Sequence, residues 1–477
     1  MFSKALLLAT PALAVPTFFS DQAQAPIQPL DHSQGYTFDP LLHLPGISPY
    51  FDAVGFGLEH TAPPGCNVTA ASYIIRHGAI YANDAEYEEF IKPFLWKLEK
   101  HRHGQWLGPL AFMAKWQSPI LEDKLEDLTP SGAVDAARVG KHLLGRYPDL
   151  VPQTQRILAD KKSRTYDTAK NLITAFPQND TIDIVRVTTN ANGSMESLIP
   201  HKSCENFSKT PGTKEQDKFI KIYGTSVAKR LAPFMPFQMT PFDVVGLQQL
   251  CGYESAINGK RSDICAVFTD AEWMAYEYSW DLKYAYMVGP MNPLSPYLGF
   301  PWLQAQSEIF QNIQEKNHPG GAWSEDQRFF LSFTHREVPP FVATALGLFN
   351  SSSGAAEEFP TDHINVFTHP YFRLLYLLTL NQWTRAWRMA DLIPFLGHVG
   401  MEKMSCERGA VSGDGPGEFI RFIANTAPRP IPDCQDGPGA SCRFDSFQKL
   451  IGKGAKKHKD FHKVCDKKGG KGKGEHE

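Results

Sequence analysis

Residues able to bind and attack an anion follow a short apolar stretch near residue 75. Residues 72–82 read S-Y-I-I-R-H-G-A-I-Y-A. Tyr73, Ile74 and Ile75 predict a buried strand that stops at Arg76-His77. Ligands of open α/β sheets bind at the carboxyl ends of strands. An imidazole there can act as nucleophile, base or metal ligand, and a guanidinium forms a planar fork for phosphate or carboxylate. The same tripeptide also occurs in ordinary turns, so other segments must support the functional interpretation.

Two further segments place polar groups in comparable positions. Residues 329–334, F-F-L-S-F-T, predict a second strand, and His335-Arg336-Glu337 follow it directly. Arg164 precedes a predicted helix over 165–176, where the positive end of the helix dipole favours an anion. An exposed arginine in a turn is the alternative for Arg164.

Alternating strands and helices predict an α/β body that positions these groups. Thr129 and Pro130 suit the start of a helix that runs to Arg146-Tyr147. Other helices are predicted over 86–101 and from about 340 to 348, a strand over 182–188, and strand-like runs over 364–380. Residues 215–313 are helical in periodicity and rich in aromatics, which indicates an all-α insertion.

Composition and termini limit the class of protein. The chain has 477 residues, 42% of them hydrophobic, and a formal net charge of −3, which predicts neither a nucleic-acid partner nor attraction to membranes. Residues 1–25 have the apolar run and small-residue sites of a secretory signal, with cleavage near Ala14 or Ala25. No later stretch is long enough to span a bilayer. The Gly/Lys-rich residues 452–477 predict a mobile, solvated tail, apart from any disulfide at Cys465.

Glycosylation sequons and cysteines agree with secretion. Five Asn-x-Ser/Thr sequons occur, at Asn67, Asn179, Asn192, Asn206 and Asn350. The eight cysteines form no C-x-x-C pair, so disulfides are favoured over zinc. Spacing leaves the pairing open, although short loops favour Cys251 with Cys265 and Cys434 with Cys442.

The chain resembles the histidine acid phosphatases, in particular the secreted fungal phytase-like acid phosphatases, over nearly all of the mature chain. Arg76-His77-Gly78 matches the start of the family signature R-H-G-x-R-x-P, and residues 128–132 (L-T-P-S-G) and 333–335 (F-T-H) are similar to further motifs. The resemblance implies a phosphoglycerate mutase-like α/β sandwich with a central, mostly parallel sheet and an inserted all-α subdomain. The expected α/β domain covers 45–214 and 321–450, and the helical subdomain covers 215–320.

The resemblance also implies a reaction and its residues. His77 would attack phosphorus and form a phosphohistidine, Glu337 would protonate the leaving group, and Arg76, Arg164 and His335 would bind the phosphate. The implied substrate is a phosphorylated small molecule, with no metal and no cofactor. The implied disulfides are Cys66–Cys406, Cys204–Cys465, Cys251–Cys265 and Cys434–Cys442.

Three positions depart from the family pattern. The second arginine and the proline of the signature are Ile80 and Ala82, and Arg336 stands where phytase-like members have aspartate. Glu337 matches instead the His-x-Glu form of the inositol-polyphosphate phosphatase branch. Losing one charge-assisted hydrogen bond to an anion costs about 1.5–3 kcal/mol, so we expect a slow or substrate-restricted phosphomonoesterase.

Two other functions remain open. The scaffold could perform another acid/base reaction with His77 and Glu337 on an acidic, non-phosphate molecule, or it could be a secreted binding protein without catalysis. A phosphatase requires all five site residues around one phosphate-sized void. A recruited enzyme requires a larger apolar cavity walled by Ile80, and a pseudoenzyme a filled void.

Overall fold

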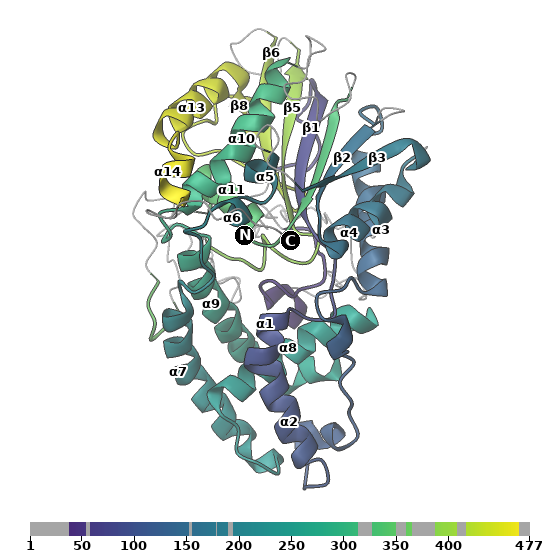
Figure 1. Ribbon diagram of the computed structural model, residues 1–477, viewed down its shortest axis with the longest axis vertical. Coiled ribbons are helices and arrows are strands. Elements are labelled where there is room, and N and C mark those ends of the chain that lie inside the picture. The colour runs from purple at the N-terminus through teal and green to yellow at the C-terminus, as the bar shows by residue number, and fades with distance from the viewer. Residues whose placement is uncertain are drawn as a thin grey trace, which may run out of the picture.

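The computed structural model shows a sheet-containing α/β body above a group of helices (Figure 1). It describes residues 38–53, 58–151, 155–177, 179–188, 194–312, 327–349, 359–364, 387–407 and 416–466. The predicted secretory signal (1–25) and the predicted strand-like run beyond residue 364 lie outside these ranges. None of the described helices is both long and apolar enough to cross a membrane.

One mixed sheet organises the body. Its strands are β1 (Cys66–Arg76), β2 (Gln155–Asp160), β3 (Ile182–Val187), β4 (Phe329–Thr334), β5 (His398–Cys406), β6 (Gly417–Ala424), β7 (Ala427–Arg429) and β8 (Cys442–Arg443). The order is β3-β2-β4-β1-β5-β6-β7, and β8 pairs with β6. Strands β1 to β4 are mutually parallel, whereas β5 is antiparallel to β1 and starts the antiparallel half.

The parallel half brings three strand ends to one edge. Arg76 pairs with Thr334 in the β1–β4 register, and Ala159 pairs with Phe333 in the β2–β4 register. His77, His335 and Asp160 therefore lie at adjacent carboxyl ends, as the strand-end rule predicts.

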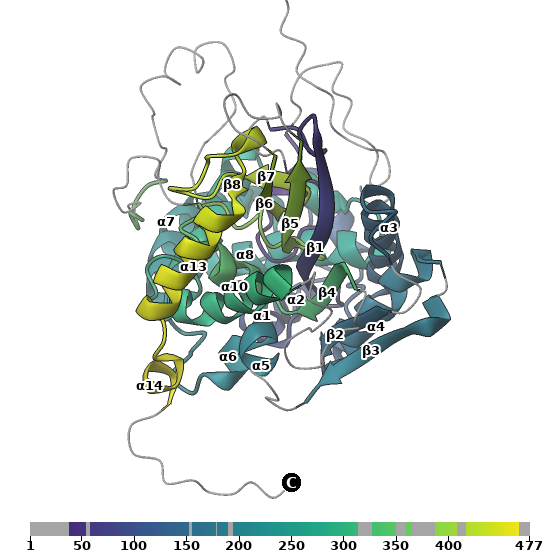
Figure 2. The same ribbon diagram turned by 90° about the horizontal axis from the view of Figure 1, so that it is seen from above.

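Strand β1 is buried on both faces because helices cover each side of the sheet. Tyr73 and Ile75 join one apolar cluster, and Ala70 and Ile74 join another, as the two-residue period of a strand requires. Figure 2 shows helices α3 (Pro130–Arg146) and α4 (Ser163–Leu172) on one side of β1, and α10 (Ser295–Asn312) and α13 (Phe444–Lys457) on the other.

Helix α3 follows the sequence prediction closely. The Thr129 side chain accepts a hydrogen bond from the Gly132 N–H, and Pro130 fills the first helical turn. Gly140 permits close packing, because a Cβ at this position would lie 2.0 Å from the carbonyl oxygen of Leu172.

We expect Gly140→Ala to lower the free energy of unfolding by about 1–3 kcal/mol through overpacking. Gly145, in the same helix, has open space around its Cα, so Gly145→Ala is the matched control. This control should gain up to about 1 kcal/mol from helix propensity. Urea unfolding of both variants measures the difference, and equal effects would contradict the close packing of α3 on α4.

Nine further α-helices belong to the described part of the chain. They are α1 (Asp84–Glu86), α2 (Lys92–Lys100), α5 (Ser194–Leu198), α6 (Pro200–Ser203), α7 (Thr213–Leu231), α8 (Pro241–Asn258), α9 (Asp270–Met287), α11 (Val338–Ala345) and α14 (Phe461–Cys465). Helices α7, α8 and α9 pack together, and α2 joins them through α8. Helix α10 instead packs against α11 and α5 beside the sheet. We infer that the helical unit includes α2 and ends before α10, which revises the expected 215–320 boundary.

The prediction of a mobile tail from residue 452 is wrong for its first part. Helix α13 continues through Lys457, with Phe447 and Ile451 buried, and α14 ends at Cys465. Apolar residues at helical spacing anchor α13, and a disulfide ties α14 to Cys204. Residues 467–477 lie outside the described ranges.

Four disulfides join the pairs that the family resemblance implies. They are Cys66–Cys406, Cys204–Cys465, Cys251–Cys265 and Cys434–Cys442. Cys66 and Cys406 face each other in the β1–β5 register, so this bond fastens the centre of the sheet.

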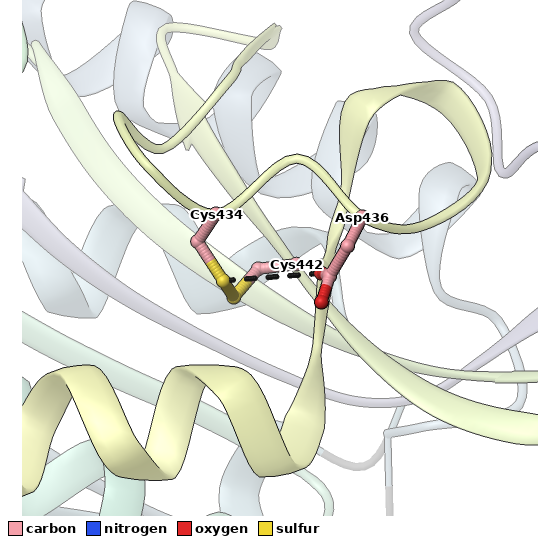
Figure 3. A group of neighbouring side chains, drawn as sticks. All are labelled: Cys434, Asp436 and Cys442. Carbon is pink, nitrogen blue, oxygen red and sulfur yellow. Dashed lines mark hydrogen bonds between the residues drawn. A yellow bond between two sulfur atoms is a disulfide. The ribbon is translucent and has the colours of Figure 1, made fainter.

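Asp436 lies beside the Cys434–Cys442 disulfide (Figure 3), and these three residues are the types that could hold a metal. Both sulfurs are consumed by the disulfide, so neither can be a thiolate ligand. Asp436 instead accepts hydrogen bonds from the Arg443 backbone N–H at 2.8 Å and the Ser446 hydroxyl at 2.7 Å, at the start of α13. The group is structural.

Candidate active site

The loop after β1 holds His77 through backbone contacts with a strand and two helices. The His77 N–H donates to Thr334 O at 3.1 Å, and the Gly78 N–H donates to Oγ1 of Thr168 in α4 at 2.9 Å. The Thr129 N–H, at the start of α3, donates to Ala79 O at 2.8 Å. These bonds fix the backbone around the imidazole before any ligand binds.

The hydrogen bonding of His77 leaves one ring nitrogen with a lone pair. Nδ1 lies 2.9 Å from Gly78 O, and a carbonyl only accepts, so Nδ1 carries the proton and Nε2 does not. Burial, together with the charges of Arg76 and Arg164, holds the pKa of His77 well below its ordinary value. The imidazole is therefore neutral in mildly acidic solution and available as a nucleophile.

Arg76 is held rigidly inside the protein. Its side chain is buried, Nη1 donates to Ile393 O at 2.7 Å, and Cζ lies 4.5 Å from the centre of the Phe395 ring. Burial and the nearby Arg336 lower the pKa of Arg76 to about 10, so it stays charged. Its Nε is buried without a partner among the described residues, so this donor is available to a bound ligand.

Arg164, the second residue of α4, is positioned by a carboxylate. Its Nη1 lies 2.7 Å from Oε2 of Glu126, whose Oε1 accepts from Nδ2 of Asn83 at 2.5 Å. Glu126 has a φ of 69°, a left-handed conformation that is costly for a residue with a Cβ. The backbone therefore accepts strain where this carboxylate meets Arg164.

His335 interacts with a buried aspartate and a lysine. Oδ2 of Asp160 lies 2.6 Å from both His335 Nε2 and Lys202 Nζ, so it accepts from both. Nε2 therefore carries the proton. Lys202 Nζ also lies 3.0 Å from Nε2, but both atoms are donors, so they do not form a hydrogen bond with each other. Burial lowers the pKa of His335 to about 4, although the Asp160 bond acts against this. Nδ1 remains an acceptor, 3.4 Å from Arg164 Nη2.

Glu337 is a buried carboxylate surrounded by cations. Its Oε1 lies 2.7 Å from Lys209 Nζ. Burial alone would raise the pKa of Glu337, but the charges of Lys209 and Arg336 hold that pKa well below its ordinary value. Glu337 is therefore ionised in the ligand-free site, and it can donate a proton only after a bound anion offsets the nearby positive charge.

All five predicted site residues line one pocket. Its volume is about 80 Å³, and it is also lined by Ile80, Asn83, Glu126, Lys162, His201, Lys202, Lys209 and Arg336. Ile80 contributes the one apolar side chain among these described lining residues. The void is neither filled, as a pseudoenzyme would require, nor mainly apolar, as a recruited scaffold would require.

The formal charges around the pocket sum to +2, which is equal and opposite to the charge of a phosphate monoester dianion. Six cations line it, and four of them pair with carboxylates: Arg336 with Glu86, Arg164 with Glu126, Lys202 with Asp160, and Lys209 with Glu337. Arg76 and Lys162 have no carboxylate partner in the described part of the chain. With neutral histidines, six positive and four negative groups leave a surplus of +2.

Several site residues were not assigned from sequence. Asp160 ends a strand beside β4, so the strand-end rule could have identified it once β2 was predicted. His201 and Lys202 lie in the short helix α6, Lys209 lies between α6 and α7, and Glu126 lies in a loop. Nothing local in the sequence distinguishes them from exposed polar residues.

A phosphate-handling enzyme is the class that this fold and pocket define. The family model of the histidine phosphatase superfamily (branch 2) matches residues 67–425, so the chain belongs to this family. Its relatives include fungal acid phosphatases and phytases. Phytase PHO112 of Candida albicans is 26% identical over 86% of this chain and 83% of its own length. Phytase A of Aspergillus oryzae is 25% identical over 87% and 89%.

Solved structures agree on the fold. The crystal structure of the phytase from D. castellii matches with a TM-score of 0.73, 23% identity, and coverage of 94% of this chain and 92% of that one. The multiple inositol polyphosphate phosphatase of Bifidobacterium longum, in complex with inositol hexasulfate, matches with a TM-score of 0.58 and 14% identity. That match covers 87% of this chain and 98% of the other.

Proposed function

We propose that the protein hydrolyses phosphate monoesters of small molecules through a phosphohistidine on His77. The observation that carries the proposal is the surplus charge of +2 around an imidazole whose Nε2 holds a free lone pair. A dianionic phosphoryl group neutralises this surplus and meets the nucleophile at the same point. Phosphoryl transfer depends mainly on such positioning and charge stabilisation.

The first chemical step forms a P–N bond and breaks the P–O bond of the ester. Nε2 of His77 attacks phosphorus, while Arg76 and Arg164 stabilise charge on the non-bridging oxygens. The protonated carboxyl of Glu337 gives its proton to the leaving oxygen, and the product is an alcohol. Nδ1–H stays on Gly78 O throughout, which offsets the positive charge that develops on the ring.

The second step reverses these roles. Glu337, now a carboxylate, takes a proton from a water that attacks phosphorus, and the P–N electron pair returns to Nε2. Inorganic phosphate leaves, and the enzyme regains its starting protonation. Splitting one displacement into two in this way lowers each barrier.

His335 can donate to phosphate only after it takes up a proton. Nε2–H is committed to Asp160, and Nδ1 is unprotonated in the ligand-free site. A bound dianion raises the pKa of His335 above its ligand-free value of about 4. Because the bound form has the higher pKa, this contribution to phosphate affinity is present at low pH and lost as pH rises through the bound-state pKa.

Substitution of Lys209 tests the charge around the proton donor. Lys209→Gln removes a cation that lowers the pKa of Glu337, so that pKa should rise. Since Glu337 must be protonated in the first step, the alkaline limb of the kcat profile should move to higher pH. Phosphate release measured across pH reports the shift. Lys221→Gln, an exposed change in α7, is the control, and an unmoved limb in Lys209→Gln would contradict the assigned donor.

A panel of phosphate monoesters, with His77→Ala alongside wild type, tests the function itself. Release of phosphate by the wild type alone supports the proposal. Turnover of a non-phosphate acidic substrate that depends on His77, without phosphate release from any monoester, would favour the recruited-scaffold alternative. The panel should include singly and multiply phosphorylated substrates, because the cations of the pocket do not define how many phosphate groups the substrate carries.

We also propose that the protein is secreted and glycosylated. Disulfides and the N-terminal apolar run support export. Asn67 is exposed at the start of β1, and Asn179 begins a short turn. Nδ2 of Asn206 donates to Val464 O at 2.8 Å and Asp466 O at 3.2 Å, and a glycan on this nitrogen would leave one proton for the two carbonyls. Asn192 and Asn350 lie outside the described residues.

A further inference from the structure

Arg336 lies in the wall of the pocket but has no part in the two steps above. It lies between His335 and Glu337, and its side chain is 13% exposed. Its Nη1 forms an ion pair with Oε1 of Glu86, and the other oxygen of Glu86 accepts from the Tyr253 hydroxyl at 2.6 Å. This buried chain fixes one edge of the guanidinium. Nε and Nη2 make no hydrogen bond to the described residues.

Arg76 and Arg336 line the same pocket, and both side chains are largely buried. Burial and, after it, the like charge of Arg336 lower the pKa of Arg76. A single buried carboxylate, Glu86, pairs with Arg336, and none pairs with Arg76 among the described residues. Holding like charges together in low dielectric is costly unless an anion binds between them. Nε of Arg76, and Nε and Nη2 of Arg336, make no hydrogen bond to the described residues and are available to such an anion.

We propose that Arg336 is a third phosphate-binding guanidinium of this enzyme, held in place by the Glu86 carboxylate. It contributes Nε–H and Nη2–H to the phosphoryl oxygens while Nη1 stays on Glu86. In this arrangement Ile80, which lines the same pocket without charge, leaves no gap in the ligation of the anion. The inference rests on the proposed phosphatase function and adds one phosphate-binding residue to it.

Binding of inorganic phosphate, measured by calorimetry, tests this role without turnover. Arg336→Met should weaken the Kd about ten- to one-hundredfold, as expected for a lost charge-assisted hydrogen bond. Arg336→Lys, which keeps the charge but not the fork, should lose severalfold. Arg230→Met is the matched control, because it breaks a comparable ion pair, with Glu272, at a residue that does not line the pocket. Its Kd should stay within about threefold of wild type.

Each outcome decides the inference. Equal weakening in Arg336→Met and Arg230→Met would overturn it, because the loss of any Arg–Glu ion pair would then account for the effect. An unchanged Kd in Arg336→Met would overturn it as well. If circular dichroism shows that Arg336→Met does not fold, the comparison of Arg336→Lys with Arg230→Met decides, and an unchanged Kd in Arg336→Lys counts against the proposal. Turnover in His77→Ala would refute the phosphatase mechanism separately, whatever the Kd values show.

Discussion

His77→Ala is expected to lower kcat for phosphate release by about 10⁴-fold or more, the scale seen when a covalent nucleophile is removed. We expect neither neighbouring imidazole to replace it. Nε2 of His335 is protonated and bonded to Asp160, and its Nδ1 lies 3.4 Å from Nη2 of Arg164, from which it accepts. The ring centroid of His201 lies 5.8 Å from that of His335. The substrate would still bind, because Arg76 and Arg164 remain. The expected result is therefore a collapse of kcat with a much smaller change in phosphate affinity.

His103→Ala provides the control for this prediction. His103 is exposed beyond α2 and does not line the pocket, so its loss should leave kcat and the melting temperature unchanged. A calorimetric Kd for phosphate in His77→Ala, close to that of wild type, would show that the site is intact. Retention of more than a small fraction of kcat in that variant would mean that water attacks the ester directly.

Glu337→Gln is expected to have the second largest effect, and its size should depend on the leaving group. General acid catalysis contributes about 10²- to 10⁴-fold, so alkyl phosphates should lose activity on this scale. p-Nitrophenyl phosphate releases a phenolate that needs no proton, so its phosphorylation step should be nearly unaffected. Comparing kcat/KM across leaving groups of increasing pKa measures the contribution, with a steeper dependence expected in the variant.

Glu99→Gln is the matched control for the carboxylate. Glu99 is 70% exposed at the end of α2 and pairs with Arg102, away from the pocket. Its variant should show the leaving-group dependence of the wild type. If Glu337→Gln also shows the wild-type dependence, Glu337 is not the proton donor, and the buried Asp160 is the next carboxylate to substitute.

The strand ends were predictable from sequence because their pattern is local. Residues 329–334 form β4 with the predicted bounds, and Arg76-His77 end β1 as the apolar run indicates. The helix over 130–146 was predictable from its cap and its proline. Strand β2 was not predicted, because Q-R-I-L-A-D is short and has little alternation. Strands β5 and β6 were not predicted either, although both are almost wholly buried.

The second half of the site was not predictable, since it depends on contacts between distant segments. Lys209 meets Glu337 and Lys202 meets Asp160 only after the segment around α6 folds over the strand ends. The pairing of Glu86 with Arg336 likewise joins residues 250 positions apart. The low pKa of Glu337 follows from this packing, whereas the sequence alone suggests only that a buried acid has a raised pKa.

Trapping the covalent intermediate tests the central claim most directly. The Glu337→Gln variant should be phosphorylated by p-nitrophenyl phosphate but should lose the base that activates water, so the phosphoenzyme should accumulate. Quenching in alkali preserves a P–N bond, which is labile in acid, and peptide mapping by mass spectrometry then locates the phosphoryl group. We expect close to one phosphoryl group per chain, on His77. Active enzyme without a phosphopeptide, or with the phosphoryl group on another residue, would contradict the mechanism.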